Sequence, residues 1–364
     1  MPRLKTTRYA YDPDYAVCPG KTVSDAIGAL GISQKVFAQR IGYTERRLTR
    51  LLSGNMPLNQ EIAIRLERVT GTPARIWNSL ETEYRDRLVR LEEKKVLLDR
   101  SNFLKEPAIK ELFVREVLKK SEDTAKQVDA VLRFFGVGSI RALSETLKIP
   151  HKAALRHSIA FESEPLPLAT WLRLGEHQAV QIPCKQYSDT AFRDALKAIR
   201  GLTVKHPEEF VPEMVRLCAE AGVALVFVPE IKGATVHGAT KWLTENKAMI
   251  VLNIRGKKND VFWFTFFHEA AHILDGNKDA LIVDVLGNKA KKTESEHQAD
   301  RFAADHLIPL QYQSELKTLR SKVDVCSFAQ RLGIDPGIVV GRMQHDGLTR
   351  FNYFNDLKQT FVWQ

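Results

Sequence analysis

Residues 262–274 read FWFTFFHEAAHIL, an apolar run that carries two histidines and a glutamate. His268 and His272 are four positions apart, so both imidazoles lie on one face of an α-helix and can bind one metal ion. Zinc lowers the pKa of a bound water to about 7, and Glu269 can take a proton from that water as it attacks a carbonyl. Unpaired imidazoles would be costly in so apolar a helix. The run therefore predicts a helical zinc site.

A second stretch, residues 293–303 with the sequence TESEHQADRFA, predicts a helix that supplies the third ligand. Glu296 and Asp300 share one face of that helix. Glu296 can complete a His₂Glu site whose fourth position stays open, which is the arrangement of a catalytic rather than a structural zinc. Asp300 can accept a hydrogen bond from a ligand imidazole and fix its tautomer. Rival third ligands are Glu294, His297 and His306.

The sequence around these two stretches contains both strand-like and helical segments. Residues 223–228 and 249–254 are apolar and β-branched, as buried strands are. Helices are expected at about 261–274 and 293–307 and through most of the chain that follows. Residues 19–201 read as helices. The C-terminal part is therefore expected to be α+β and the N-terminal part all-α.

Residues 33–52 predict two short helices joined by a tight turn. Ser33 and Thr44 are suited to cap them, and Gly42 can adopt the positive φ that the turn requires. The residues expected to face a core are Val36, Phe37 and Ile41. The second helix has a basic outer face, as DNA-reading helices do, because arginine can bond guanine edges and threonine can contact phosphates. Candidate DNA-contacting residues are Gln34, Thr44, Glu45, Arg46, Arg47, Thr49, Arg50 and Asn55.

Residues 17–85 resemble the XRE-type helix-turn-helix domain of HigA-like antitoxins. The likeness includes Cys18-Pro19-Gly20, where that family has a Pro-Gly before its first helix, and LNQEIAIRLERVTGTPARIW at residues 58–77. It implies a five-helix, usually dimeric domain that binds the double-stranded DNA of a palindromic operator. Glu45-Arg46-Arg47 stands where a Gln-Thr-Val type of sequence is common, so the operator sequence cannot be transferred from the family.

Residues 205–345 resemble the ImmA/IrrE family of metallopeptidases. The likeness lies in FTFFHEAAHIL at residues 264–274 and in EHQADRFAADHLIP at residues 296–309, where Asp300 replaces a common asparagine. Residues 237–239 and 250–253 also fall where the family has strands.

This resemblance implies a zincin-like, thermolysin-type zinc endopeptidase. By the matching positions, His268, His272 and Glu296 would be the ligands and Glu269 the general base. Family members often cleave a helix-turn-helix repressor and so relieve repression in prophages or stress responses. His237 could stabilise an oxyanion, although a surface or core histidine is the favoured interpretation.

A short internal similarity occurs near the end of the chain, where SFAQRLG at residues 327–333 repeats much of VFAQRIG at residues 36–42. A second DNA-reading motif is one interpretation. A helical pair that packs over the peptidase core is favoured, because the helix that follows is apolar (Ile338, Val339) and lacks a basic outer face.

Composition limits the partners and the compartment. The chain has 364 residues and a net charge of +10, and residues 1–90 alone hold 15 Lys+Arg and 9 Asp+Glu, a net charge of +6. Such a basic segment favours a polyanionic partner. No apolar stretch approaches the ~18 residues of a spanning helix, and no signal-peptide core is visible, so no membrane partner is expected. The four cysteines are scattered without a CxxC pair, which favours a reducing, cytoplasmic compartment.

Together these features predict a multidomain protein. Its parts are a helix-turn-helix domain at residues 17–85, a helical linker or interaction region at 86–204, a metallopeptidase domain with C-terminal helices at 205–345 and a tail at 346–364. The expected function is a homodimeric DNA-binding regulator with a zinc endopeptidase domain. It would control a prophage, stress or toxin–antitoxin operon, with a repressor or toxin as its substrate. The alternatives are a HigA-like antitoxin whose peptidase-like domain senses or binds with little catalysis, and a plain cytosolic peptidase.

Overall fold

The computed structural model describes residues 13–147, 165–253, 258–278, 281–285 and 293–361. Its contacts divide the chain into two units. The first contains the residues up to 102 together with 122–128, and the second contains 103–121 and the residues from 129 onward.

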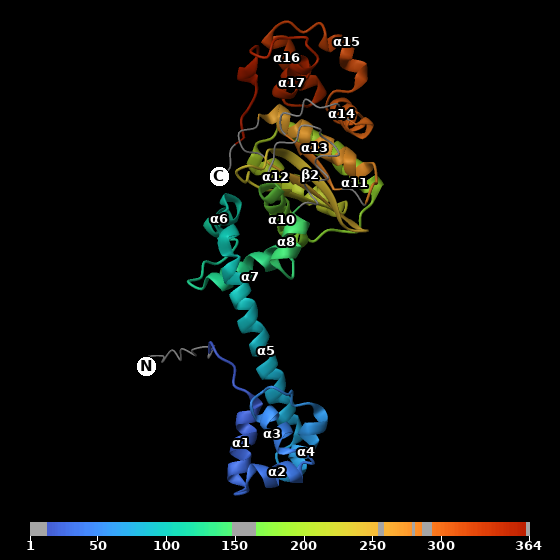
Figure 1. Cartoon of the computed structure of the whole chain (residues 1–364). Coiled ribbons are helices and arrows are strands. Elements are labelled where there is room, and N and C mark those ends of the chain that lie inside the picture. Colours follow the sequence, from blue (N-terminus) through green and yellow to red (C-terminus); the bar gives the residue numbers. More distant parts are fainter. Residues whose placement is uncertain (1–12, 148–164, 254–257, 279–280, 286–292, 362–364) are drawn as a thin grey trace, which may run out of the picture. The chain divides into compact units, whose positions relative to one another are not determined.

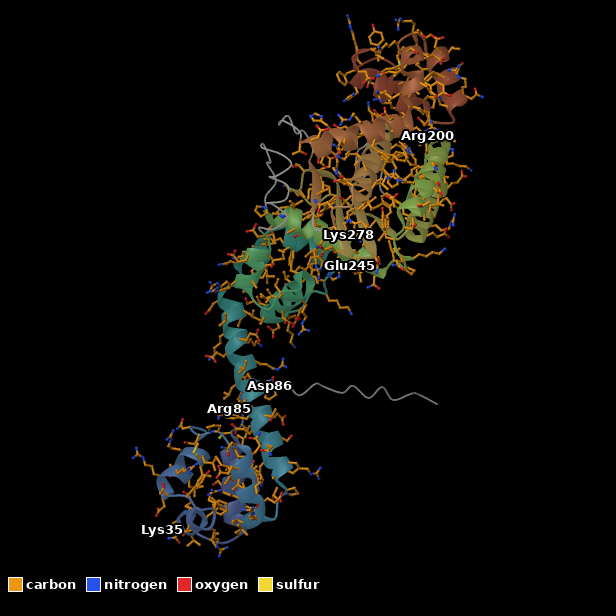
Figure 2. All side chains as sticks on the ribbon, turned by 90° about the vertical axis from the view of Figure 1, so that its right-hand side faces the viewer. Lys35, Arg85, Asp86, Arg200, Glu245 and Lys278 are labelled. Atoms are coloured by element: carbon orange, nitrogen blue, oxygen red, sulfur yellow. The ribbon has the colours of Figure 1, made fainter. Side chains whose placement is uncertain are left out.

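The first unit is all-α, as the sequence predicts (Figure 1). Its helices are α1 (Pro19–Ala29), α2 (Gln34–Arg40), α3 (Glu45–Leu52), α4 (Gln60–Thr70) and α5 (Ala74–Asp99). One buried cluster joins all five, and its members include Val23, Phe37, Leu48, Leu51, Ile62, Leu66 and Trp77. Further along α5, ion pairs between residues four apart support the exposed helix, and Figure 2 labels one member of each, Arg85 and Asp86.

The predicted turn between α2 and α3 is confirmed in its details. The Ser33 side chain accepts a hydrogen bond from the backbone N–H of Val36, and the Thr44 side chain accepts one from Arg47. Gly42 has a φ of +72°. The prediction that Val36 faces the core is wrong, because its side chain is 38% exposed. Consecutive helical residues point about 100° apart, and Phe37 takes the buried direction instead.

The second unit is α+β, with helices on both faces of one sheet. Its helices are α6 (Pro107–Val114), α8 (Ile140–Thr146), α10 (Pro165–Gln181), α11 (Asp189–Gly201), α12 (Pro207–Glu220), α13 (Asn259–Leu274), α14 (Glu294–Leu307), α15 (Gln313–Leu316), α16 (Lys322–Leu332) and α17 (Pro336–His345). The helix α7 (Thr124–Phe135) begins in the first unit and continues into the second. Short 3₁₀ turns occupy Ser101–Lys105, Leu202–Val204, Leu310–Tyr312 and Asn355–Leu357.

The sheet contains β1 (Val223–Phe227), β2 (Val236–Thr244), β3 (Lys247–Leu252) and β4 (Ile282–Val285) in the order β1-β3-β2-β4. β1 and β3 are parallel, with Leu225 opposite Ile250, and the other pairs are antiparallel. Ile250 belongs to the core shared with α13, whereas the next residue, Val251, lies against Gly175 of α10. Since both faces are covered, β1 and the part of β3 that follows Lys247 are continuously apolar rather than alternating.

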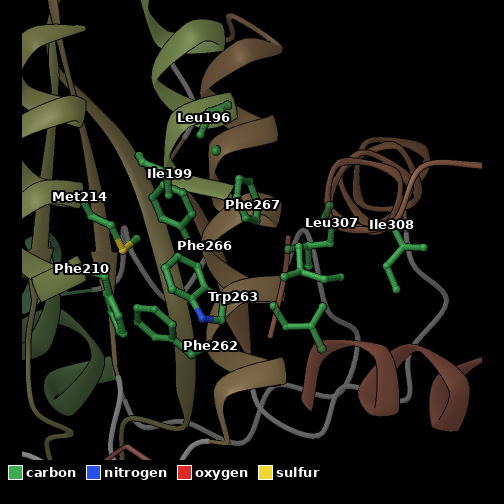
Figure 3. Close-up of a cluster of buried hydrophobic side chains, with 14 of the residues drawn as sticks. Leu196, Ile199, Phe210, Met214, Phe262, Trp263, Phe266, Phe267, Leu307 and Ile308 are labelled. Carbon is green, nitrogen blue, oxygen red and sulfur yellow. The ribbon is translucent and has the colours of Figure 1, made fainter. Parts of the chain in front are cut away.

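The helix α13 is fixed by aromatic packing (Figure 3). Phe262, Trp263, Phe266 and Phe267 are all buried. They pack with residues of α11 and α12, namely Leu196, Ile199, Phe210 and Met214. The ring centroids of Phe210 and Trp263 are 4.8 Å apart. This packing holds the helix that carries both histidines of the HExxH motif.

The C-terminal end of α14 is held by Arg200 of α11, which Figure 2 labels. The guanidinium donates to the backbone oxygens of His306 (2.8 Å) and Leu307 (2.9 Å), and also to that of Leu332 at the end of α16 (3.0 Å). A cation that bonds the free carbonyls of a helix end also complements the helix dipole. Arg200 therefore fixes α14, the helix that carries Glu296.

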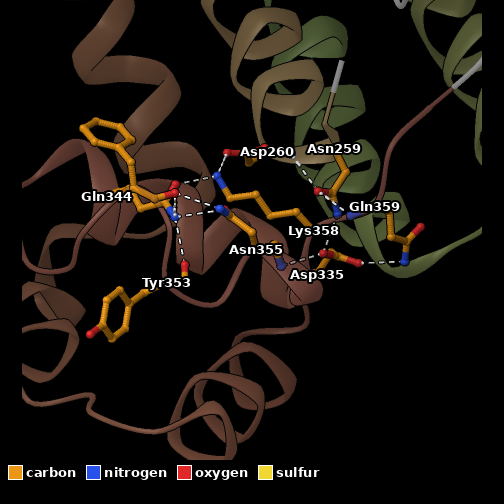
Figure 4. Close-up of polar contacts among 10 residues, drawn as sticks. Asn259, Asp260, Asp335, Gln344, Tyr353, Asn355, Lys358 and Gln359 are labelled. Atoms are coloured by element: carbon orange, nitrogen blue, oxygen red, sulfur yellow. Dashed lines mark hydrogen bonds and ion pairs between the residues drawn. The ribbon is translucent and has the colours of Figure 1, made fainter. Parts of the chain in front are cut away.

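A polar network fixes the start of α13 (Figure 4). Asn259 donates from its side chain to Asp335 (2.6 Å) and from its backbone N–H to the oxygen of Gln359 (2.8 Å). Lys358 forms an ion pair with Asp260 and donates to Gln344. Burial raises the pKa of Asp335, against the hydrogen bonds from Gly337 and Asn259 that lower it. Residues 358 and 359, which belong to the segment expected as a C-terminal tail at 346–364, thus lie against the start of α13.

The expected boundary at residues 85/86 lies inside α5. The expected linker region at 86–204 is shared between the two units, and α10 and α11 pack in the second. Residues 148–164 lie outside the described chain. Within the described residues, no helix combines the length and the apolarity needed to cross a bilayer.

Candidate metal centre and nucleic-acid interface

Three buried side chains from two helices converge in the second unit. His268 and His272 come from α13 and Glu296 comes from α14, and their potential ligand atoms all lie within 4.8 Å of one another. The two histidine Nε2 atoms are 3.1 Å apart. The Glu296 oxygens lie 3.3 Å from Nε2 of His268 and 3.4 Å from Nε2 of His272. Two imidazole nitrogens and one carboxylate therefore face a common point.

The electrostatics of this group favour positive charge. Burial disfavours the charged form of His268, but hydrogen bonds with Asp300 and Glu296 outweigh it and raise the pKa of His268 to about 10. Burial likewise disfavours the charged carboxylate of Glu296, yet hydrogen bonds with both histidines hold its pKa well below the ordinary value. A metal ion bound to His268 would displace the additional proton of this imidazole, because a histidine ligand binds in its neutral form.

The rival ligands lie elsewhere. Glu294 is exposed and pairs with Arg301. His297 is exposed, and Nε2 of His306 lies 3.1 Å from the backbone oxygen of Leu196. In the described part of the chain, His268, His272 and Glu296 are the one cluster of three such residues with metal-binding geometry. Two nitrogens and one carboxylate suit zinc with an open fourth position.

Asp300 supports the first histidine. Its Oδ1 lies 3.1 Å from Nδ1 of His268. A hydrogen bond there places the proton on Nδ1 and leaves Nε2 free as a metal ligand. Asp300 lies one helical turn after Glu296, so a single helix supplies both carboxylates.

Glu269 is fully buried beside β2, where Gly238 makes room for it. A Cβ at position 238 would lie 2.7 Å from Oε1 of Glu269 and 2.9 Å from its Cγ. Sequence reasoning missed this role of Gly238, although an isolated glycine inside a strand is a known sign of a close approach. His237, the neighbouring residue on β2, is partly exposed and is not one of the three converging groups.

All eight candidate DNA-contacting residues are exposed in the first unit. Six of them lie on α3 or at its N-cap, and the others are Gln34 and Asn55. The guanidinium of Arg47 stacks 3.9 Å from the ring centroid of Tyr43, which restricts its motion. The Thr44 hydroxyl caps α3 and the Thr49 hydroxyl donates to the backbone oxygen of Glu45. Both hydroxyls thus already form hydrogen bonds within the helix, whereas Arg46, Arg47 and Arg50 are exposed cationic groups.

Two family models match the chain. A helix-turn-helix family matches residues 25–77, and the peptidase M78 family, described as an IrrE N-terminal-like domain, matches residues 218–344. A solved structure from Nostoc punctiforme, described as an antidote protein of a plasmid maintenance system, is 25% identical and covers 23% of this chain and 92% of its own, with a TM-score of 0.22. No curated protein matches.

Proposed function

Because residues 25–77 form a helix-turn-helix domain and residues 218–344 an IrrE N-terminal-like domain, we propose that this chain is a DNA-binding regulator that hydrolyses peptide bonds at a zinc ion. The proposed target is a regulatory protein, such as a repressor or a toxin of a prophage, stress or toxin–antitoxin operon. The proposed DNA partner is a double-stranded operator, bound by a homodimer.

The convergence of His268, His272 and Glu296 carries the peptidase proposal. A bound zinc ion would supply a water of lowered pKa and polarise the scissile carbonyl. Glu269 is one residue along α13 from the first ligand, and its buried carboxylate would accept a proton from the attacking water. Asp300 would keep the His268 ring oriented through its 3.1 Å contact. A site used only to bind zinc has no need of such a carboxylate.

The exposed basic face of α3 supports the DNA-binding proposal. Arg46, Arg47 and Arg50 all lie on this eight-residue helix and are exposed. Arginine can bond guanine edges in the major groove with two hydrogen bonds or contact phosphates. A helix with one buried leucine face and one arginine face has the two properties that a recognition helix needs.

One observation favours the second candidate function, a repressor or antitoxin whose peptidase-like domain senses or binds a partner with little turnover. Glu269 is 0% exposed, so the proposed general base is closed off from bulk water. In this alternative the metal group is a structural or sensory element, and the protein acts by binding DNA and a partner rather than by cleavage.

The deciding experiment compares the wild type with Glu269→Gln and with a matched control, Glu294→Gln, on the exposed face of α14. Zinc content is measured by elemental analysis. Cleavage is measured as the rise in fluorescence of a mixture of quenched fluorescent peptides. We expect one zinc per chain in all three proteins and a loss of cleavage of about 100-fold or more in Glu269→Gln alone.

Two results would contradict the peptidase proposal. A wild-type protein that contains no zinc would contradict the assignment of the metal centre. Cleavage by Glu269→Gln at the wild-type rate would contradict the assignment of Glu269 as the general base. A zinc-loaded wild type that cleaves no peptide in the mixture would favour the sensory alternative.

A further inference from the structure

A cavity of about 230 Å³ lies among α13, α14 and α17 of the second unit. Its apolar wall includes Phe264, Leu307, Ile308 and Ile338, and its polar residues are Asp260, Asp300, Arg342 and His345. An apolar cavity of about 150 Å³ holds one benzene molecule. This cavity is therefore large enough for a ring with a short polar substituent, a molecule of about ten non-hydrogen atoms.

The cavity borders the His268 ring on the side opposite the point that His268, His272 and Glu296 face together. Nε2 of His268 faces His272 and Glu296, whereas Nδ1, on the opposite edge of the ring, faces Asp300. Asp300 lines the cavity, and so does Phe264, whose ring centroid lies 6.2 Å from that of His268. An occupant would touch the residues that support His268 without occupying the open position of the metal.

Two polar atoms of the lining are buried and, among the described residues, have no hydrogen-bond partner. They are Oδ1 of Asp260, an acceptor, and Nη1 of Arg342, a donor. The charges of both side chains are already balanced, since Lys358 pairs with Asp260 and Asp346 pairs with Arg342. Asp300 likewise pairs with His268, so an additional charge would have no partner of its own. Neither unpartnered atom is exposed to the cavity, so the exposed lining is mainly apolar and suits an uncharged molecule.

We propose that this cavity binds a small, uncharged, mainly apolar molecule, and that its occupancy strengthens metal binding through Asp300. The Asp300 side chain is 26% exposed. A ligand in the cavity excludes water from the hydrogen bond between Asp300 and His268, and hydrogen bonds in a drier environment are stronger. The better-oriented imidazole then holds zinc more firmly.

This proposal rests on the proposed metal centre but not on peptide hydrolysis. By linkage, a molecule that raises zinc affinity must itself bind more tightly to the zinc-loaded protein. The cavity would thus make the metal content of the protein responsive to a metabolite of this chemistry.

The experiment uses the full chain loaded with zinc and three probes of one shape, namely phenylacetamide, phenylacetate and the phenethylammonium ion. Calorimetry measures binding, and the rate of zinc release is followed with a chromogenic chelator. We expect saturable binding of phenylacetamide, at least tenfold weaker binding of both charged probes, and zinc release slowed about fivefold or more by phenylacetamide.

Ala304 of α14 also lines the cavity, so Ala304→Phe should fill it and abolish both effects. Val323→Phe is the matched control, because Val323 is 74% exposed on α16 and does not line the cavity. Three results would overturn the proposal, namely no saturable binding to the wild type, equal binding of the charged probes, or binding that leaves zinc release unchanged. Neither readout requires turnover, so a failure of the peptidase proposal is distinguishable from a failure of this one.

Discussion

Gly238→Ala tests whether the position of the Glu269 carboxylate controls the proposed chemistry. The added methyl group would lie 2.7 Å from Oε1, 2.9 Å from Cγ and 3.0 Å from Cδ of Glu269. Non-bonded heavy atoms prefer separations of about 3.5–4.0 Å, so the carboxylate must retreat by roughly 0.5–1 Å. A misplacement of about 1 Å can cost about 100-fold in rate. That loss corresponds to a barrier higher by about 2.7 kcal/mol.

The assay measures kcat for peptide cleavage together with zinc content. We expect kcat to fall about 100-fold while zinc stays at one per chain, because the methyl group meets Glu269 and not the ligands. Gly201→Ala is the control, since position 201 has a helical φ of −66° and a Cβ there meets nothing within 4 Å. Cleavage by Gly238→Ala within about twofold of the wild type would refute the reasoning. Loss of zinc would also refute it, because the methyl group would then act on the metal group.

Three further outcomes are expected. Asp300→Asn should weaken zinc binding about tenfold in chelator competition, because the hydrogen bond that orients His268 is weakened; unchanged affinity would contradict this. Burial lowers the pKa of His306 from 6.5, so its stabilising contribution is present above that pH and is lost as the pH falls through the folded pKa. Between about pH 7 and pH 5 the Tm of His306→Gln should therefore fall less than the Tm of the wild type. An equal fall in Tm for both proteins would count against this. Replacing Arg46 and Arg47 with alanine should reduce the salt dependence of DNA binding, measured by fluorescence anisotropy, by a slope of about 0.9 for each phosphate that the variant no longer neutralises; an identical slope would speak against phosphate binding by these arginines.

The sequence was most informative where a local rule determines the structure. Ser33 and Thr44 cap their helices as predicted, because capping depends on a side chain and the backbone three residues away. The strands near residues 223 and 249 were found from apolar runs, which occur because both faces of the sheet are covered. The spacing within the HExxH motif likewise places two imidazoles on one helical face.

Features that depend on distant contacts were not predicted. The strand β4 is four residues long, and its pairing with β2 cannot be read from so short a segment. The role of Gly238 depends on Glu269, which is 31 positions later and lies on another element. The packing of Phe361 against Phe210 and Phe262 also joins segments that are far apart in sequence. Periodicity describes a segment, whereas these features require the assembled fold.

The polar network at the start of α13 has a consequence for the order of folding. Asn259 and Asp260 are held by residues 76 to 100 positions further along the chain. Closing loops of this length has an entropic cost before the contacts stabilise anything, so such contacts form late. The segment with HExxH can therefore collapse onto the sheet early, while its first turn stays loose. The start of α13 becomes fixed only when residues 358 and 359 form their contacts with Asp260 and Asn259.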